Sequence, residues 1–200
     1  MGPVTRALIL ANVVVFGMQQ LYDDTLTDVF ALWPVGEYLV PPGERVGFEP
    51  WQLVTSAFLH ASTAHIFLNM FALWMFGREV EHTLGSRRYA VLYLAAILSG
   101  ALVQLLVVST NVGRQIYPTV GASGGVFGVL LAFAWIYPRR VVVLLIPPIP
   151  MPAWLFVGLY GLIELVSGVF GTKSGIAHFA HLGGMLGAFI VLRYWRSQTR

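Results

Sequence analysis

Six long apolar stretches constrain the fold of this chain more than any other feature. A helix that crosses a membrane needs roughly 20 consecutive, mostly apolar residues. The stretches cover residues 4–21, 51–76, 89–108, 121–137, 153–170 and 177–195. We therefore predict an all-α membrane protein in which six transmembrane helices form a single domain over residues 1–200.

The composition agrees with a lipid environment. Charged residues make up only 10% of the chain, whereas a soluble domain carries about 25%. So few charges cannot cover a surface that faces water. The chain contains no cysteine, which excludes disulfides, thiolate zinc sites and cysteine nucleophiles. The basic residues form no run interleaved with aromatic side chains, so nucleic acid is not an expected partner.

The basic residues are concentrated on one side of the predicted bundle. With six spans, the two termini, the second loop and the fourth loop share one face. Of the 12 Lys and Arg residues, only Arg45, Arg114 and Lys173 lie on the other face. Because basic loops stay in the cytoplasm, both termini are predicted to be cytoplasmic and the loop 22–50 external. We expect a multi-pass protein of a prokaryotic cytoplasmic membrane.

Polar and ionisable side chains within the apolar stretches are candidates for function, since burying them in lipid is costly. They are His60, His65, Asn69, Ser123, Glu164, His178 and His181. The predicted topology places His65 with Asn69, Ser123 and His181 in the outer halves of three different helices. Polar groups from three helices at a similar depth predict a common site.

Ser123 lies in the segment GASGGVFG. Gly121 and Gly124 allow another backbone to approach closely, and they leave nearby N–H groups free to face a bound oxygen. The segment also matches the G-x-S-x-G elbow of soluble hydrolases, but no strand precedes it here. Serine among small residues is also common where membrane helices pack, so the motif alone leaves a structural role open.

His181 lies in the segment AHFAHLGGMLGAF. Gly184 and Ala188 share one helical face and permit close contact with a neighbouring helix. If that neighbour is the helix over 121–137, His181 can reach Ser123 and accept its proton. A backbone carbonyl could satisfy the imidazole instead. His178, one turn away, is expected nearer the membrane interface.

His65 and Asn69 are four residues apart and therefore share one helical face. Two hydrogen-bond donors on one face suit an oxyanion hole, which stabilises developing negative charge. Zinc binding is the alternative, but asparagine is a poor zinc ligand and no carboxylate accompanies the pair. We predict no metal and no cofactor.

Glu164 is the one acid within the predicted spans, and the sequence does not assign it to His181. A Ser-His dyad is the more economical prediction. Phe127, one turn after Ser123, is a candidate ring to pack against the imidazole.

Together these motifs resemble the rhomboid family of intramembrane serine proteases. The resemblance covers nearly the whole chain and rests on FLHASTAHIFLNM (58–70), GASG (121–124) and AHLGG (180–184), in this order and topology. GREVEHTLGS (77–86) is similar to the family's segment after the second helix, where Glu81 matches a structural glutamate.

The resemblance implies a six-helix fold whose water-filled cavity opens to the outside. Ser123 would attack a peptide bond in a transmembrane segment and His181 would activate it. The oxyanion would be held by His65, Asn69 and the Ser123 amide, and His60 would help to line the polar mouth. Transmembrane protein substrates and the lipid bilayer are the partners implied.

Two positions depart from the family pattern. Gln52 follows Trp51 where arginine is typical, and Phe127 stands where a tyrosine often packs on the histidine. Both members of the dyad remain. The alternatives are a non-catalytic relative that binds transmembrane clients, and a channel or transporter, whose polar groups should spread through the depth of the bilayer.

Overall fold

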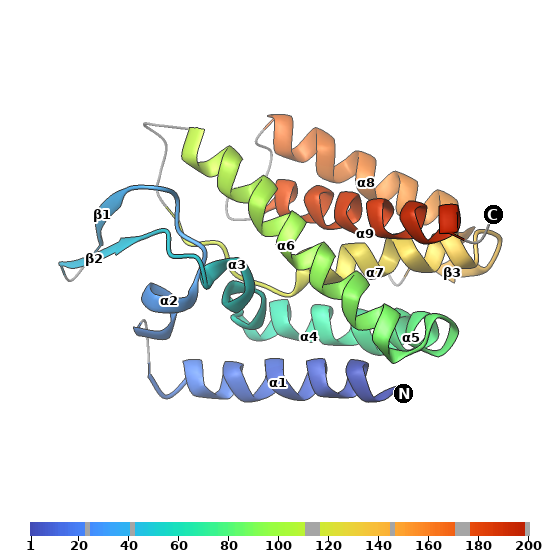
Figure 1. The fold of residues 1–200 in the computed structure, drawn as a ribbon, viewed down its shortest axis with the longest axis horizontal. Helices are drawn as coiled ribbons and strands as arrows, with labels where there is room; N and C mark the ends of the chain where they lie inside the picture. The colour runs from blue at the N-terminus through green and yellow to red at the C-terminus, as the bar shows by residue number, and fades with distance from the viewer. Residues whose placement is uncertain (23–24, 41–42, 111–116, 145–146, 171–176, 199–200) are drawn as a thin grey trace.

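The structure, a computed structural model, describes residues 1–22, 25–40, 43–110, 117–144, 147–170 and 177–198. It is mostly helical. Its longer helices are α1 (Pro3–Gln19), α6 (Ser86–Thr110), α7 (Ser123–Ile136), α8 (Ala153–Phe170) and α9 (His178–Gln198). Figure 1 shows α1, α7, α8 and α9 with roughly aligned axes, and α6 crosses them obliquely. These helices coincide closely with five of the apolar stretches.

The remaining apolar stretch, 51–76, is not one helix, so that prediction is wrong. It is divided into α3 (Gln52–Thr55), the 3-10 helix η1 (Ser56–Phe58), α4 (Thr63–Ala72) and the π-helix η2 (Leu73–Gly77), which continues into α5 (Arg78–Leu84). The break has a local cause. Ser62 has extended backbone angles, and its side chain accepts a hydrogen bond from His65 N, which caps the start of α4.

The all-α prediction is also incomplete, because two short hairpins and a short helix connect the long helices. In the first loop, α2 (Thr25–Phe30) precedes strands β1 (Glu37–Val40) and β2 (Glu44–Gly47), which pair antiparallel. After α7, strands β3 (Val141–Val143) and β4 (Pro150–Pro152) pair in the same way. The first loop is therefore a small folded unit at one end of the helices (Figure 1).

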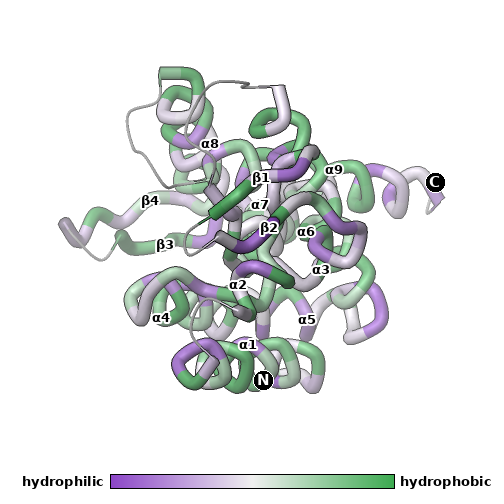
Figure 2. Tube along the Cα trace, turned by 90° about the vertical axis from the view of Figure 1, so that its left-hand side faces the viewer, coloured by the Kyte–Doolittle hydropathy of each residue, from purple (hydrophilic) through white to green (hydrophobic). Residues whose placement is uncertain are grey.

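The outward faces of the helices are apolar. Large hydrophobic side chains are exposed on α1, including Leu10 and Val14, and on α8, including Leu162 and Val169. Figure 2 shows hydrophobic residues on outer as well as inner turns of the helices. Within the described residues, two helices, α6 and α8, are long and apolar enough to cross a membrane, while α1 and α7 are shorter apolar helices.

Helices α6, α7 and α9 meet through a glycine seam, which consists of Gly100, Gly124, Gly128, Gly183, Gly184 and Gly187. A Cβ atom on Gly184 would lie only 2.0 Å from Gly124 O, and one on Gly100 would lie 2.7 Å from Ala180 O. A Cβ atom at these distances would overlap the main chain of the next helix, so no side chain fits there. The seam therefore determines how closely α7 approaches α9.

The carboxylate of Glu81 on α5 holds the start of α1. It accepts hydrogen bonds from Val4 N at 2.9 Å, Thr5 N at 2.9 Å, Thr5 Oγ1 at 2.6 Å and Ser86 Oγ at 2.8 Å. The first N–H groups of a helix lack acceptors within the helix, and a carboxylate there also interacts favourably with the helix dipole. Glu81 thus joins the starts of α1 and α6 to α5.

We expect Glu81→Gln to lower the free energy of unfolding by about 1–3 kcal/mol, since it weakens charged hydrogen bonds at a buried site. Thermal unfolding of the purified protein at pH 7 measures this loss. The matched control is Glu79→Gln on the same helix, which removes only the pairs with Arg78 and Arg140 at a partly exposed position. An equal loss in both variants would contradict a special role for Glu81.

The same contact predicts a dependence on pH. Burial raises the pKa of Glu81, but the hydrogen bonds from Thr5, Val4 and Ser86 outweigh it and hold the pKa below its ordinary value. The stabilisation is therefore complete above the unfolded-state pKa of about 4.3. It is lost as the pH falls through the lower, folded-state pKa. Unfolding scans below pH 4 should show this loss in the native protein and a smaller one in Glu81→Gln.

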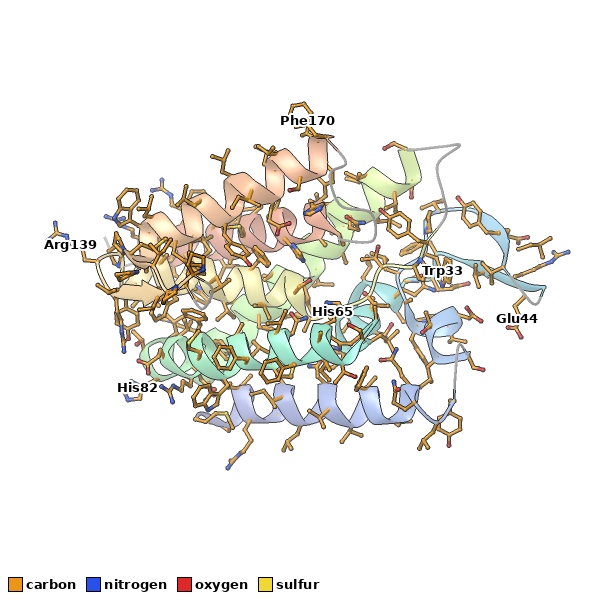
Figure 3. All side chains as sticks on the ribbon, turned by 180° about the vertical axis from the view of Figure 1, so that it is seen from behind. Trp33, Glu44, His65, His82, Arg139 and Phe170 are labelled. Carbon is orange, nitrogen blue, oxygen red and sulfur yellow. The ribbon has the colours of Figure 1, made fainter. Side chains whose placement is uncertain are left out.

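The two ends of the molecule differ in their side chains. Figure 3 shows His82 and Arg139 at one end and Trp33 and Glu44 at the other. At the first end, guanidinium groups lie over aromatic rings, with Arg78 4.8 Å from the Trp74 ring centroid. Some basic residues used in the topology argument, Arg114, Lys173 and Arg200, lie outside the described residues.

Candidate active site

The chain before Ser123 is anchored to the first loop and to η1. Thr119 and Leu32 form an isolated antiparallel bridge, with N–O distances of 2.9 and 3.0 Å. Gly121 N donates to Ser56 O at 2.9 Å, and Gly121 has a φ of +130°, which favours glycine. These contacts turn the chain so that Ser123 is the first residue of α7.

Ser123 lies beside His181 of α9. His181 Nε2 is 2.7 Å from Ser123 Oγ, a hydrogen-bond distance. His181 is buried, and Ser123 is partly exposed. The ring of Phe127, one turn along α7, stacks on the imidazole with centroids 4.2 Å apart and planes inclined by 5°. The imidazole is therefore held between the serine and an aromatic face.

The glycine seam brings these two side chains together, as the small residues of AHLGGMLGA predict. A Cβ on Gly128 of α7 would lie 3.1 Å from Gly184 O and 3.3 Å from Ala188 Cβ. Gly184 and Ala188 thus face α7, and they lie one and two turns along α9 from His181. The close approach of the backbones places the imidazole within reach of the helix start at Ser123.

Glu164 of α8 lies on the far side of the same imidazole. Its Oε2 is 2.9 Å from His181 Nδ1 and 2.6 Å from His178 Nδ1. The expectation that Glu164 is not paired with His181 is wrong. The side chain of His178, which we expect nearer the membrane interface, is buried against Glu164. A buried acid needs partners, and these two histidines of the neighbouring helix supply them.

Glu164, His178 and His181 are also the residues that could hold a metal ion. One ligand atom from each lies within 4.8 Å of the other two, and all three residues are buried. Hydrogen bonds already account for the arrangement, because both imidazoles contact the same carboxylate oxygen. That no metal is needed stays a prediction.

The other side of Ser123 is formed by Gly121 and His65. A Cβ on Gly121 would lie 2.8 Å from His65 Nε2 and 3.7 Å from Ser123 Oγ, so both side chains lie beside Gly121. Asn69 is buried one turn further along α4, where its Nδ2 donates to His65 O at 3.0 Å. His65 lies toward the Trp33 end of the molecule in Figure 3. The structure therefore places the His65 imidazole near the first N–H groups of α7, while the Asn69 amide is hydrogen-bonded within α4.

His60 does not line an open mouth, contrary to the expectation from sequence. It is 2% exposed, and its ring packs edge-on against His65 with centroids 5.0 Å apart. Neither ring nitrogen has a hydrogen-bond partner within the described residues. His60 therefore supports the ring of His65 from behind.

The arrangement has the parts of an acyl-transfer site. The Ser123 hydroxyl contacts an imidazole that can accept its proton. Donors on the other side of the serine, at a helix start, can stabilise an oxyanion. These groups come from the motifs that the sequence predicts; Glu164, which contacts the same imidazole, does not.

Comparison with known proteins identifies the family. The sequence model of the Rhomboid domain matches residues 47–197 of this chain. This chain belongs to the rhomboid family. The match includes α3 to α9, and with them every side chain of the site described above.

Individual relatives agree with this assignment. Rhomboid protein 1, mitochondrial, of Saccharomyces cerevisiae is 29% identical over 188 residues, which are 90% of this chain and 49% of that protein. Rhomboid protease GlpG of Klebsiella pneumoniae is 29% identical over 187 residues, 92% of this chain and 60% of that protein. Rhomboid protease GluP of Bacillus subtilis is 30% identical over 141 residues, which are 70% of this chain and 25% of that protein. The rhomboid described here thus spans from a quarter to 60% of the length of these relatives.

In this rhomboid, Gln52 organises the first loop. It is 1% exposed; its Oε1 accepts from Trp33 N at 3.2 Å and from Glu49 N at 3.1 Å. Its Nε2 donates to Val29 O at 3.3 Å and to Gly47 O at 3.0 Å. The glutamine that stands where the family has arginine therefore joins α2 and β2 to the start of α3.

Sequence reasoning missed the contact of Glu164 with this rhomboid's histidines. A usable signal was present. An acid in an apolar helix must find partners, and His178 and His181, three residues apart on the next helix, share one face toward it.

Proposed function

We propose that this chain is an intramembrane serine endopeptidase that cleaves transmembrane segments of membrane proteins. The observation that carries the proposal is the 2.7 Å distance between His181 Nε2 and Ser123 Oγ at the start of α7. Membership of a family whose relatives include proteases named GlpG and GluP supports the same activity. The apolar outer faces of the helices support a site enclosed by lipid.

In the proposed reaction, Ser123 Oγ attacks the carbonyl carbon of the scissile peptide while His181 Nε2 takes the hydroxyl proton. The Ser123 amide, His65 and Asn69 stabilise the oxyanion. His181 then gives its proton to the leaving amine nitrogen as the C–N bond breaks. Water, activated by the same imidazole, hydrolyses the acyl-enzyme and restores the serine.

We further propose six membrane spans with both termini in the cytoplasm of a prokaryotic cell. The concentration of basic residues at the end marked by Arg139 supports this orientation. Substrates are single helices that must unwind locally, because a helical peptide has its backbone hydrogen-bonded. We expect small or helix-breaking residues near the bond that is cut.

A serine-reactive fluorescent phosphonate tests the proposal on the purified protein. We expect covalent labelling, with the label mapped by mass spectrometry to Ser123 alone. The other serines, such as Ser167, are internal controls, since an unactivated hydroxyl does not react. Reconstitution with a panel of single-span proteins should then give fragments cut within the apolar segment.

Each outcome of these two measurements has a meaning. A folded protein that resists the phosphonate, or is labelled elsewhere, contradicts the proposed nucleophile. Labelling at Ser123 without cleavage of any membrane-spanning partner would favour a different acyl-transfer activity. If neither occurs but single-span proteins are retained by the reconstituted protein, the client-binding alternative replaces the protease.

A further inference from the structure

Glu164 is a buried acid that the proposed dyad leaves without a task. It is 7% exposed in the middle of α8, and its partners His178 and His181 are 6% and 8% exposed on α9. A carboxylate so far from water is costly unless hydrogen bonds compensate it. Here two imidazole nitrogens approach the single atom Oε2, at 2.6 and 2.9 Å.

These contacts determine where the proton of His181 resides. An ionised carboxylate can only accept hydrogen bonds, so each Nδ1 that contacts Glu164 must carry a hydrogen. A neutral imidazole with a proton on Nδ1 has a lone pair on Nε2. That nitrogen is the one that lies 2.7 Å from Ser123 Oγ. The carboxylate thus selects the tautomer that can accept the serine proton.

We propose that Glu164 is a positioning residue which, with Ser123 and His181, completes a Ser-His-Glu triad assembled from three helices. The inference rests on the proposed serine protease function and extends it beyond a dyad. When Ser123 Oγ bonds to the substrate carbonyl carbon, its proton moves to His181 Nε2 and the imidazole becomes positive. Glu164 stays ionised, keeps the Nδ1 proton in place and stabilises this charge.

His178 holds the acid in turn. Its Nδ1 donates to the same Oε2 from one turn nearer the start of α9, so the carboxylate is fixed between two donors of one rigid helix. The rotamer of Glu164 is then set without any contact to the substrate. Phe127 blocks one face of the His181 ring, which leaves the plane of the imidazole aligned with both Ser123 and Glu164.

Hydrogen bonding fits this cluster better than a bound metal. Bonds from zinc to nitrogen and oxygen are about 2.0–2.2 Å long in tetrahedral sites, which keeps ligand atoms roughly 3.3 Å apart. The two nitrogen–oxygen separations here are 2.6 and 2.9 Å, which are hydrogen-bond lengths. A chelator should therefore leave the reactivity of Ser123 unchanged.

The test compares phosphonate labelling of Ser123 in the native protein with Glu164→Gln and Glu164→Asp. We expect Glu164→Gln to lower the limiting labelling rate by about 10²- to 10⁴-fold, as for the acid of other triads. The concentration for half-maximal rate should stay within twofold, because phosphonate binding is not affected. Glu164→Asp, which keeps the charge, should recover at least tenfold over Glu164→Gln. Ser167→Ala, a buried polar position on α8, is the matched control and should label at the native rate.

Several results would overturn the inference. A folded Glu164→Gln that labels at the native limiting rate would leave the protease standing but remove Glu164 from its mechanism. Loss of native labelling on adding EDTA would favour a metal at the cluster. No labelling of native Ser123 would refute the proposed function, and the triad with it.

A second measurement does not need the Glu164 variants. Nitrogen NMR of the native protein with ¹⁵N-labelled histidine reports the tautomer of each ring, with His181 assigned by its loss in His181→Gln. We expect His181 to carry its proton on Nδ1 at neutral pH. A proton on Nε2 would contradict the role assigned to Glu164.

Discussion

His181→Ala should lower the rate constant for phosphonylation of Ser123 by about 10⁶-fold, the order of the loss when a catalytic histidine is removed from a serine protease. The reason is the contact between Nε2 and Oγ at 2.7 Å. Without an acceptor for its proton, a serine hydroxyl is a weak nucleophile at neutral pH. Labelling of the variant is followed over hours and compared with a diluted sample of the native protein, so that rate constants differing by this factor can both be measured.

The control for this variant is another histidine in the same protein. His82→Ala changes an exposed residue at the opposite end of the molecule from the first loop (Figure 3), and should label at the native rate. Both variants should have native circular dichroism. A His181→Ala protein that retains labelling within tenfold of native would remove the imidazole from the role of general base.

Gly184→Ala should abolish most of the reactivity of Ser123 by separating α7 from α9. The new Cβ would lie 2.0 Å from Gly124 O, and the overlap cannot be relieved by a side-chain rotation because the atoms it meets belong to the main chain of α7. Relief of this overlap requires a shift of about 1 Å, and displacements of that size at a catalytic pair lower rates by about 10²-fold. Overpacking should also reduce the unfolding free energy by about 1–3 kcal/mol.

A glycine elsewhere in the chain separates this effect from a general one of alanine in a membrane helix. Gly158 lies in α8, and a Cβ there would meet nothing within 4 Å. Gly158→Ala should therefore retain native labelling, with a stability equal to or above that of the native protein. If Gly184→Ala labels at the native rate, α7 and α9 can accommodate the added methyl group, and the close contact at Gly184 is not needed for reactivity.

The helices and most of the site residues could be predicted because their signals are local. Long apolar stretches indicate helices, and the small residues around Ser123 and His181 indicate which faces meet. The break before α4 could not be predicted from hydropathy, because it depends on Ser62, whose side chain caps the helix within an apolar region. The two hairpins were missed because their strands are only three or four residues long.

The pairing of Glu164 with His181 was missed for a different reason. The acid comes from α8, which carries none of the other motifs, so no spacing along the sequence relates Glu164 to His181. Burial was the better guide, because the low solubility of a charge in lipid forces Glu164 toward donors on a neighbouring helix. The burial of His60 and His178 could not be predicted, because position along a span does not reveal which face a side chain occupies.

The glycine seam has a consequence for how a chain of this kind can change over time. On α9, Gly184 and Gly187 touch the main chain of neighbouring helices, while Leu186 and Ile190 are exposed on the outer face. On the outer face one apolar side chain can replace another, so the sequence of that surface can vary with the surrounding lipids. At the seam every substitution adds atoms, and none can be offset by a rotamer. The distance between Ser123 and His181 therefore depends on glycines at which any substitution enlarges the side chain and pushes the helices apart.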